Sequence, residues 1–113
     1  MENIIQQIAE KLIHKILERA YSGGISDIDA LSSDVLGDCR EAAIGIVEAI
    51  TAGLNQQIRD DKERRKAEGL VLKERERERS LLTELGRLDI PRDYYYDREN
   101  DQYVYLLDHV IGV

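Results

Sequence analysis

Apolar residues recur every three or four positions along the first fifth of the chain. Between residues 3 and 21 the isoleucines and leucines fall on one side of a helix, the pattern of an amphipathic helix that packs through one face. Asn3 can cap its start, with Gln6 three residues later. We expect this helix to end at Gly23-Gly24, because glycine readily adopts the left-handed conformation of a helix end.

A second and longer apolar stripe runs from Ile28 to Ile58, again at helical spacing. Ser26 or Asp27 can cap its start, since a short polar side chain accepts a hydrogen bond from a free backbone amide. Three polar residues at 32–34 compete for backbone hydrogen bonds. The pattern therefore predicts one long helix, either continuous or broken at that point.

Small residues recur along this second helix at Gly45, Ala49 and Gly53. A ridge of small side chains lets another helix approach closely, so we predict that these three residues form an interface. The expected arrangement is a helical hairpin whose first helix lies antiparallel along the second. The sequence leaves open whether the helices pair within one chain or between two copies.

Beyond the second stripe, helix formers continue as far as Gly69, a natural helix end. Residues 73–79 then alternate basic and acidic side chains and fit two structures. A strand places Arg75, Arg77 and Arg79 on one face, whereas a helix mixes and pairs the opposite charges. We expect a strand from about Arg77 onward, and the preceding residues stay open between strand and helix.

The last third of the chain contains five of the six tyrosines and the single proline. Gly86 predicts a tight hairpin turn. Residues 87–96 then read as a strand that carries four large side chains on one face: Leu88, Ile90, Tyr94 and Tyr96. Because Pro91 cannot donate a ladder hydrogen bond, this strand either lies at a sheet edge or carries a bulge.

A second turn is predicted at 97–101, a short strand at 103–106, and a last helical turn that starts near Asp108 and ends at Gly112. The fold class is therefore α+β: an N-terminal helical hairpin with a long second helix, followed by a small antiparallel β-meander of about three strands. We expect one N-terminal module over 1–113, with 1–68 helical and 69–113 forming the meander and final turn. The apolar end at Val113 suggests that the module is cut from a longer chain.

The net charge of −7 is unevenly distributed. Residues 59–79 carry nine basic and seven acidic side chains, whereas the segments before and after them are acidic. An acidic chain is not a default nucleic-acid binder, since phosphate attraction requires a positive surface. Any contact with DNA is therefore expected to be local, and the middle third is the candidate for it.

Cysteine usage suits a reducing compartment, and the hydropathy pattern bears on membrane insertion. The single cysteine, Cys39, excludes an internal disulfide and lies on the second apolar stripe, so we expect a buried, inert thiol. No apolar run approaches the roughly 20 residues that span a bilayer. The N-terminus lacks the basic start and apolar block of a signal peptide. We expect a cytoplasmic protein without a membrane partner.

Candidate DNA-binding residues are the arginines of the alternating segment and of the meander: Arg75, Arg77, Arg79, Arg87 and Arg92. They can contact phosphates, or they can form a solvated strand paired with its own glutamates. The tyrosines can stack on unpaired bases, or they can pack across strands with hydrated hydroxyls. Asp89, Asp93 and Asp108 lack the spacing of a ligand set, so we expect no metal. The serines have no evident base partner, and we expect no catalytic residue and no cofactor.

The segment LLTELGRLDIPRDYYYDRENDQYVYLLDHVIGV, residues 81–113, resembles the N-terminal region of ISLre-type insertion-sequence transposases, long catalogued as an uncharacterised protein family. The shared pattern is a Leu-Thr-x-x-Gly hairpin, an Arg with a Tyr pair, and a Tyr-Val-Tyr-Leu-Leu-Asp segment. These elements correspond to Leu82, Thr83 and Gly86, to Arg92, Tyr94 and Tyr95, and to 103–108 with Gly112. The acidic catalytic residues of such enzymes would lie beyond Val113.

The resemblance implies a non-catalytic N-terminal module of a transposase. Such a module would assist the binding of duplex DNA at transposon ends, the assembly of subunits, or both. The alternative from another class is a protein-interaction or dimerisation module, a homo-oligomer without direct DNA contact. The small-residue ridge and the net negative charge favour the alternative, and the arginine pattern favours the first interpretation.

Overall fold

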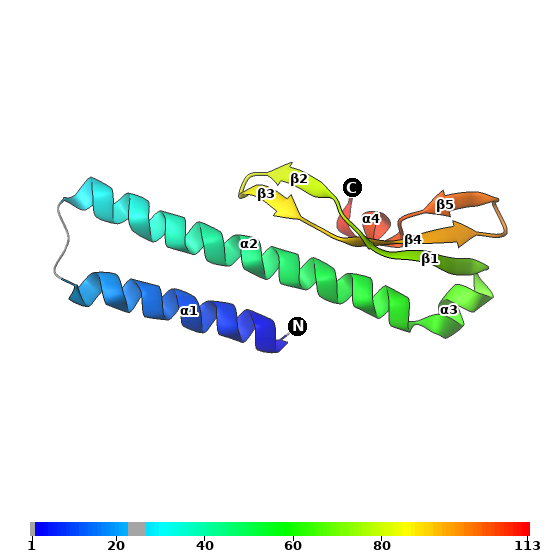
Figure 1. The fold of residues 1–113 in the computed structure, drawn as a ribbon, viewed down its shortest axis with the longest axis horizontal. Coiled ribbons are helices and arrows are strands. Elements are labelled where there is room, and N and C mark those ends of the chain that lie inside the picture. Colours follow the sequence, from blue (N-terminus) through cyan, green and yellow to red (C-terminus); the bar gives the residue numbers. More distant parts are fainter. Residues whose placement is uncertain (1, 23–26) are drawn as a thin grey trace.

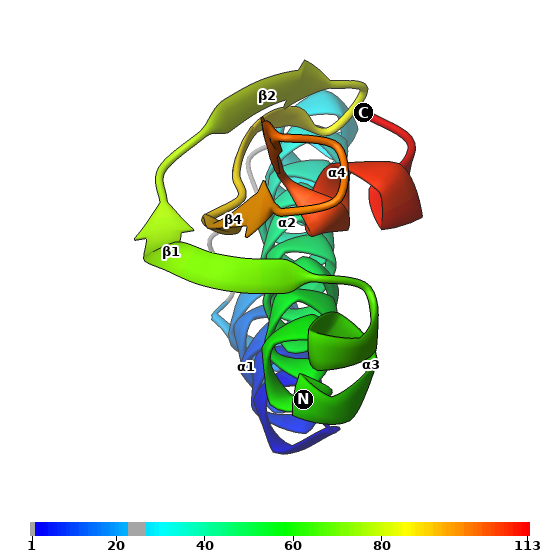
Figure 2. The ribbon, with the colours of Figure 1, turned by 90° about the vertical axis from the view of Figure 1, so that its right-hand side faces the viewer.

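The computed structural model describes residues 2–22 and 27–113, which form a rod of 63 × 26 × 18 Å. Two antiparallel helices make up one end of the rod, and the strands lie over the C-terminal half of the longer helix (Figure 1). Viewed along the rod, the strands and the first helix occupy different sides of the long helix (Figure 2). The α+β class and the N-terminal helical hairpin with a long second helix are confirmed.

The hairpin consists of α1 (Glu2–Tyr21) and α2 (Ile28–Asp60). Asp27 caps α2, since its carboxylate accepts a hydrogen bond of 2.7 Å from the Ala30 amide. The polar residues at 32–34 do not interrupt α2, which is continuous there. The predicted stop at Gly23-Gly24 and the alternative cap Ser26 lie outside the described residues.

A short helix, α3 (Lys62–Ala67), continues the chain after a break at Asp61. Asp61 leaves helical geometry with a ψ of 66° and accepts a hydrogen bond from the Arg64 amide, so it ends one helix and caps the next. Gly69 then takes the left-handed conformation with a φ of 71°. Its carbonyl accepts a hydrogen bond of 2.9 Å from the Arg98 amide, which fixes the turn against the second half of the chain.

Five strands follow, where the sequence predicted about three. They are β1 (Leu70–Arg77), β2 (Ser80–Thr83), β3 (Gly86–Asp89), β4 (Arg92–Asp97) and β5 (Gln102–Val104). All pairings are antiparallel, in a three-stranded sheet of order β1-β4-β5 and a two-stranded sheet of β2 and β3. The predicted hairpin turn is confirmed at Gly86, which adopts a φ of 107° after the turn residues Glu84 and Leu85.

The alternating segment is a strand up to Arg77, so the strand interpretation is the correct one for residues 73–77. The strand predicted from about Arg77 onward was wrong at its start, because residues 78–79 lie outside any strand and β2 begins only at Ser80. The alternation within β1 is also not regular. The register of β1 against β4 shifts twice, between Leu72 and Glu74 and between Glu74 and Arg77. Glu76 has a φ of 53°, a conformation that interrupts a regular strand. The prediction that Arg75, Arg77 and Arg79 share one face of a continuous strand was therefore wrong.

Pro91 lies in a break between β3 and β4. At that break the alternation of inward-facing and outward-facing side chains shifts by one residue. Leu88 and Ile90 are buried before it, but after it the fully buried side chains are Asp93 and Tyr95. The prediction that Tyr94 and Tyr96 share a face with Leu88 and Ile90 was wrong, because two residues outside any strand reset the alternation. Since β4 is central, Pro91 is accommodated by the break and not by an edge position.

The core lies between the C-terminal half of α2, the β2–β3 hairpin and the last helix, α4 (Leu106–Ile111). Its buried residues are Leu88, Ile90 and Leu107, with partly buried side chains of α2 packed around them. Gly112 ends α4 with a φ of 77°, as the sequence predicted.

Two predictions from the hydrophobic pattern have different outcomes. Cys39 is exposed and not buried, because α2 packs through other faces at this position. Within residues 2–22 and 27–113, no helix combines the length and the apolar character needed to cross a membrane.

Candidate nucleic-acid interface

Four tyrosines gather on the face of the three-stranded sheet that points away from α2. Asp93 and Tyr95 point towards α2 and are fully buried, so their neighbours Tyr94 and Tyr96 project from the opposite face. Tyr103 lies opposite Tyr96 in the register of β4 and β5, and Tyr105 follows at the end of β5. We call this group the tyrosine face: Tyr94, Tyr96, Tyr103 and Tyr105.

The rings of the tyrosine face form one continuous row. Tyr94 stacks on Tyr103 with ring centroids 5.0 Å apart and an interplanar angle of 12°. Tyr94 also contacts Tyr105 at 4.8 Å, and Tyr103 contacts Tyr96 at 5.1 Å. Tyr103 is the outermost member and is 55% exposed. The row therefore offers an aromatic surface to solvent that is held in place by ring packing.

Basic side chains cover parts of this row. The Arg77 guanidinium lies 4.5 Å from the centroid of the Tyr94 ring, and the Lys73 ammonium lies 5.9 Å from that of Tyr96. The Arg92 guanidinium lies 3.6 Å from the Tyr105 centroid. A cation over a ring is attracted by its negative face. The arrangement combines aromatic rings and positive charge, the two features that sheet surfaces use to bind unpaired nucleotides.

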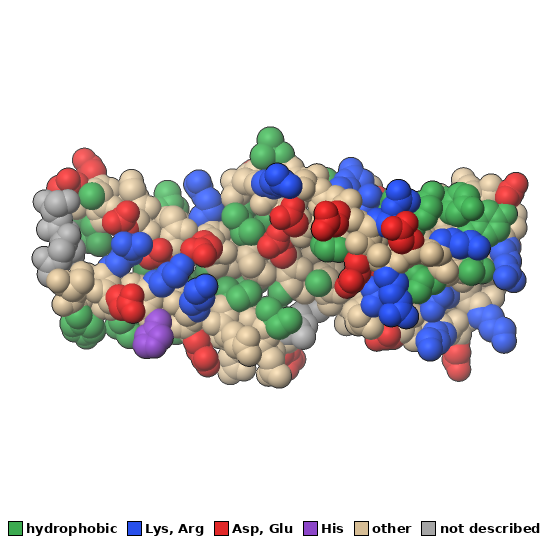
Figure 3. All heavy atoms as spheres, in the orientation of Figure 1, with side chains coloured by type: hydrophobic (Ala, Val, Ile, Leu, Met, Phe, Trp, Pro, Cys, Tyr) green, Lys and Arg blue, Asp and Glu red, His purple; other side chains and the backbone are tan. Residues whose placement is uncertain are grey.

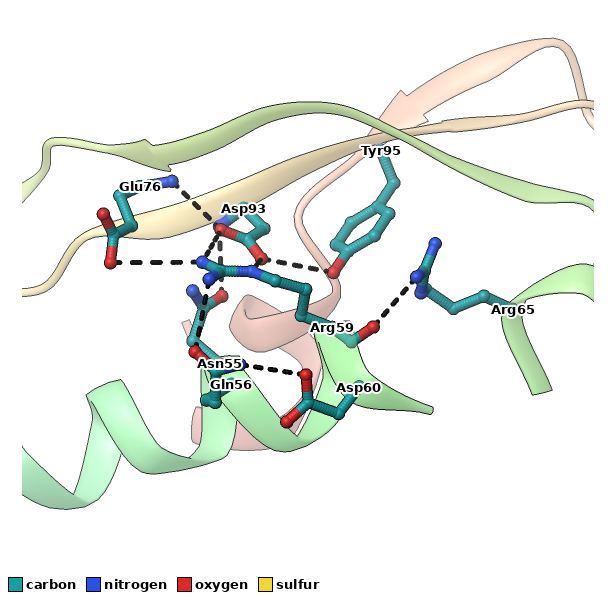
Figure 4. A network of polar contacts seen from close by, with 8 residues as sticks. All are labelled: Asn55, Gln56, Arg59, Asp60, Arg65, Glu76, Asp93 and Tyr95. Atoms are coloured by element: carbon teal, nitrogen blue, oxygen red, sulfur yellow. Dashed lines mark hydrogen bonds and ion pairs between the residues drawn. The ribbon is translucent and has the colours of Figure 1, made fainter. Parts of the chain in front are cut away.

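A buried polar network holds the other face of the sheet on α2 (Figure 4). Arg59 donates two hydrogen bonds to the Asp93 carboxylate, from Nε at 2.7 Å and from Nη2 at 2.8 Å. Asp93 Oδ1 also accepts from the Glu76 amide at 3.0 Å, and the Asp93 amide donates to Asn55 Oδ1 at 3.0 Å. One carboxylate therefore links α2, β1 and β4.

The charge states of this network are set by opposing effects. Burial disfavours the Asp93 carboxylate, but the hydrogen bonds from Arg59 and from the Glu76 amide outweigh it and lower the pKa of Asp93 below its ordinary value. Burial, together with the adjacent Asp93 charge, raises the pKa of Tyr95 to about 12. Asp93 is thus ionised and Tyr95 neutral at neutral pH, which suits a structural link.

A second arginine–carboxylate group lies at the end of the tyrosine face. Arg92 Nη1 contacts Asp108 Oδ2 at 2.5 Å, and Arg79 Nη1 lies 3.6 Å from the same oxygen. Arg92 is only 7% exposed. This pair joins β4 to α4 beneath the Tyr105 ring.

The five arginines predicted to bind DNA therefore have different surroundings. Arg77, Arg79 and Arg92 converge on Tyr105 and Asp108. Arg87 lies on the β2–β3 hairpin, where it pairs with Asp89 at 3.4 Å and donates to the Ser80 hydroxyl. Arg75 is exposed on β1. Arg92 is buried and paired with Asp108, whereas Arg77 is half-buried over the Tyr94 ring.

Exposed basic residues also gather at the end of the rod formed by α3, as the blue side chains on the right of Figure 3 show. We call this group the basic end: Lys62, Arg64, Lys66, Lys73 and Arg98. Lys73 belongs to both the basic end and the margin of the tyrosine face. Acidic residues such as Glu63 and Glu68 lie among them, and Glu68 pairs with Arg64 at 3.3 Å, so the positive charge is partly compensated.

The three small residues predicted to form a helix interface have different surroundings in the structure. A Cβ added at Gly45 would lie 3.2 Å from Ile8 Cδ1, so this glycine allows α1 of the same chain to approach. Ala49 and Gly53 lie farther along α2 and are partly exposed.

The three aspartates considered for a metal site are separate in space and engaged elsewhere. Asp93 binds Arg59, Asp108 binds Arg92, and Asp89 accepts from Ser80. In the described part of the chain, no group of three or more His, Cys, Asp or Glu residues is arranged to hold a metal ion.

Sequence reasoning missed Arg59, Asn55 and Lys73. Arg59 lies just past the end of the apolar stripe, and its only sequence signal was the start of the basic middle third. Asn55 was an unremarked polar residue within the stripe, at a position that proved to be 4% exposed. A buried polar residue on a helix is a signal for a tertiary hydrogen bond, and this one could have been found.

Comparisons with known proteins identify relatives of this chain. The family described as "Uncharacterised protein family (UPF0236)" matches residues 23–113. A UPF0236 protein of Caldanaerobacter subterraneus subsp. tengcongensis is 40% identical over 81 residues, 72% of this chain and 15% of the relative. Another from the same organism is 38% identical over 69 residues, 61% of this chain and 14% of the relative. The aligned part thus spans about one seventh of the length of the curated relatives. No solved structure gives a significant match.

Proposed function

The chain belongs to the uncharacterised protein family UPF0236, and we propose that it is the non-catalytic N-terminal module of a transposase-like protein, which assists DNA end binding and subunit assembly in transposition. The resemblance of residues 81–113 to the N-terminal region of ISLre-type transposases motivates the proposal. The observation that carries the DNA-binding part is the tyrosine face, with Lys73 and Arg77 over its rings. The chemistry would lie in the remainder of the longer protein.

In this proposal the basic end and the tyrosine face make different contacts with DNA. Basic residues of the basic end attract phosphates, and this attraction weakens at higher salt concentration, because less free energy is gained when counterions are released from the DNA. The rings of the tyrosine face stack on bases that are unpaired at a DNA end, since every base has a π-face. This division favours an end with unpaired nucleotides over the interior of a duplex, where the bases are already stacked.

Fluorescence anisotropy tests the proposal with two labelled DNAs, a blunt duplex and the same duplex with a single-stranded overhang. We expect binding to both at low salt, tighter binding to the overhang, and a loss of affinity as salt increases. Absence of binding to either DNA at low salt would contradict the proposal.

A matched pair of substitutions localises the contact. Tyr103→Ala removes the outermost ring of the tyrosine face and is expected to weaken overhang binding by about 1–3 kcal/mol. Tyr21→Ala removes an 84% exposed tyrosine at the far end of α1 and should leave the affinity unchanged. Equal effects of the two substitutions would exclude the tyrosine face as the binding surface.

A second candidate is a protein-interaction or dimerisation module without direct DNA contact. The observation that favours it is the set of large apolar side chains exposed on the helical hairpin, among them Ile13 and Leu36 at 58% and 59%. The two candidates are compatible, because the apolar side chains and the tyrosine face lie on different elements.

A further inference from the structure

Two irregularities in β1 decide which of its charged side chains reach the tyrosine face. The register against β4 shifts between Leu72 and Glu74, and again between Glu74 and Arg77. Such a shift is a β-bulge, in which an extra residue re-aims the side chains around it. Residues that lie opposite each other in an antiparallel pair share a face, and Glu74 lies opposite Tyr94. The first bulge therefore turns the Glu74 carboxylate to the tyrosine face.

The second bulge sends two neighbouring side chains to different sides of the sheet. Glu76 has a φ of 53°, and its amide donates to Asp93 on the side that faces α2. Its carboxylate lies 4.0 Å from Arg59 on the same side (Figure 4). The Arg77 guanidinium lies on the other side, over the rings of the tyrosine face. Regular alternation would separate Glu74 from Arg77, whereas the two bulges place them side by side.

The Arg77 guanidinium is held in position but is not saturated with hydrogen bonds. Its side chain is 41% exposed, and its only charged partner in the described part of the chain is Glu74, with Arg77 Nε 3.4 Å from Glu74 Oε2. This separation exceeds the roughly 2.7–2.9 Å of a strong charge-assisted hydrogen bond. Arg59, by contrast, donates two hydrogen bonds to Asp93 beneath the sheet. The Arg77 donors can therefore bind an anion from solution once Glu74 turns away.

A carboxylate and a phosphate bind a guanidinium in the same way, since each presents oxygens to its planar set of N–H groups. The Glu74 side chain is 60% exposed, so it can turn into solvent without opening the sheet. An exposed ion pair contributes little free energy, which makes its exchange for a phosphate inexpensive. The attraction between Arg77 and the rings persists during this exchange, so the guanidinium stays beside the bases that stack there.

We propose that Glu74 is an internal competitor for the phosphate that Arg77 binds when an unpaired DNA end lies on the tyrosine face. In the free chain the Glu74 carboxylate neutralises Arg77 and keeps it over the rings. In the complex a phosphate of the single strand takes the place of Glu74, which turns into solvent. Glu74 thus limits the affinity of the tyrosine face for phosphate groups. The inference rests on the proposed function and assigns a regulating residue to the same site.

Fluorescence anisotropy with the overhang DNA tests the competition. Glu74→Gln keeps the length of the side chain and ends the ion pair, so the dissociation constant should fall by about two- to fivefold. Glu84→Gln removes the same charge from the exposed turn between β2 and β3. At about 0.1 M salt, where distant charges are largely screened, this control should change the dissociation constant by less than about 1.5-fold. Equal effects of the two substitutions would overturn the proposal.

A double-mutant cycle shows whether Glu74 acts through Arg77. Arg77→Gln should weaken binding, because the phosphate loses its guanidinium partner. Adding Glu74→Gln to this chain should change the dissociation constant by less than about 1.5-fold, because the competitor then has nothing to compete for. The same gain in both backgrounds would show that Glu74 acts only by repelling the DNA, and would overturn the proposal. Circular dichroism would verify that these exposed substitutions leave the fold intact.

The same titrations separate failure of this inference from failure of the proposed function. If the unchanged chain binds the overhang DNA and Glu74→Gln binds it equally well, the proposed function stands and the competition is excluded. If neither chain binds it at low salt, both fail. Binding by Glu74→Gln that is tighter than that of the unchanged chain, and that depends on Arg77, is the result expected.

Discussion

Both ends of the molecule contain an arginine–aspartate pair that joins two elements, but the pairs have different surroundings. In the hairpin, Arg19 and Asp38 link α1 to α2 with side-chain exposures of 36% and 8%. Under the sheet, Arg59 and Asp93 link α2 to β4 with exposures of 12% and 0%. Asp93 also accepts a backbone hydrogen bond from Glu76, so removing it affects three elements at once. The sheet end therefore has a buried core and a buried ion pair, whereas the hairpin end is joined by a more exposed ion pair and leaves apolar side chains exposed.

The largest contrast is expected when the two aspartates are replaced in turn. Asp93→Ala leaves Arg59 buried without its partner and should lower the free energy of unfolding by about 3–5 kcal/mol. Asp38→Ala should cause a much smaller loss, because water can solvate the remaining Arg19. Urea unfolding followed by circular dichroism measures both. Equal losses would contradict the distinction between the two ends.

Truncation of a core leucine should lower the free energy of unfolding by a similar amount. Leu107 is 1% exposed and packs with Leu88 and Ile90, so Leu107→Ala should cost about 2–5 kcal/mol through lost burial and a cavity. Leu82→Ala, at 89% exposure on the neighbouring hairpin, should change stability by less than about 0.5 kcal/mol. Thermal unfolding of both variants would check this, and a comparable loss in both would place the core elsewhere.

Acid should act on the sheet end through Asp93. Its pKa is lowered in the folded chain, so the ionised carboxylate contributes stability that is present above the unfolded-state pKa and is lost as the pH falls through the folded value. We expect the free energy of unfolding to decline below about pH 4. The decline should be shallower in Asp93→Asn, which keeps the shape but cannot titrate. Parallel pH profiles for the two chains would show that Asp93 is not the responsible group.

The smallest effects should come from replacing a glycine with alanine at each end of the molecule. We expect the free energy of unfolding to rise at one position and to fall at the other. Gly37 lies in α2 with open space around it, so Gly37→Ala should stabilise the chain by about 0.5–1 kcal/mol. Gly86 has a φ of 107° at the β2–β3 turn, so Gly86→Ala should destabilise it by about 1 kcal/mol or more although no atom obstructs the added carbon. Differential scanning calorimetry would resolve the two shifts. The same sign at both positions would contradict the conformational assignment.

The helices were predictable because a long apolar repeat specifies them without help from distant residues. The start of α2 at Asp27 and the end of α4 at Gly112 also followed from local chemistry. The start of β1 at Leu70 did not, since an alternating charged segment fits a strand or a helix equally well until its partner strand is known. β1 is fixed by its register against β4, which lies some 20 residues farther along the chain.

The candidate interface was predictable in composition but not in arrangement. The tyrosines and arginines were evident in the sequence, and the turn before Tyr103 was placed correctly. The reversal of parity at Pro91, which turns Tyr95 inward and Tyr94 outward, depends on how β4 docks on α2. The pairing of Arg92 with Asp108 likewise requires α4 to fold back on β4. Such contacts are decided by tertiary packing and leave no local signal.

Hydrogen exchange of backbone amides tests most directly whether the sheet end of this molecule is more stable than the hairpin end. The account predicts that the amides of α1, which has no buried residue, exchange rapidly, while those of β4 are strongly protected. Protection of the α1 amides equal to that of the β4 amides would contradict it.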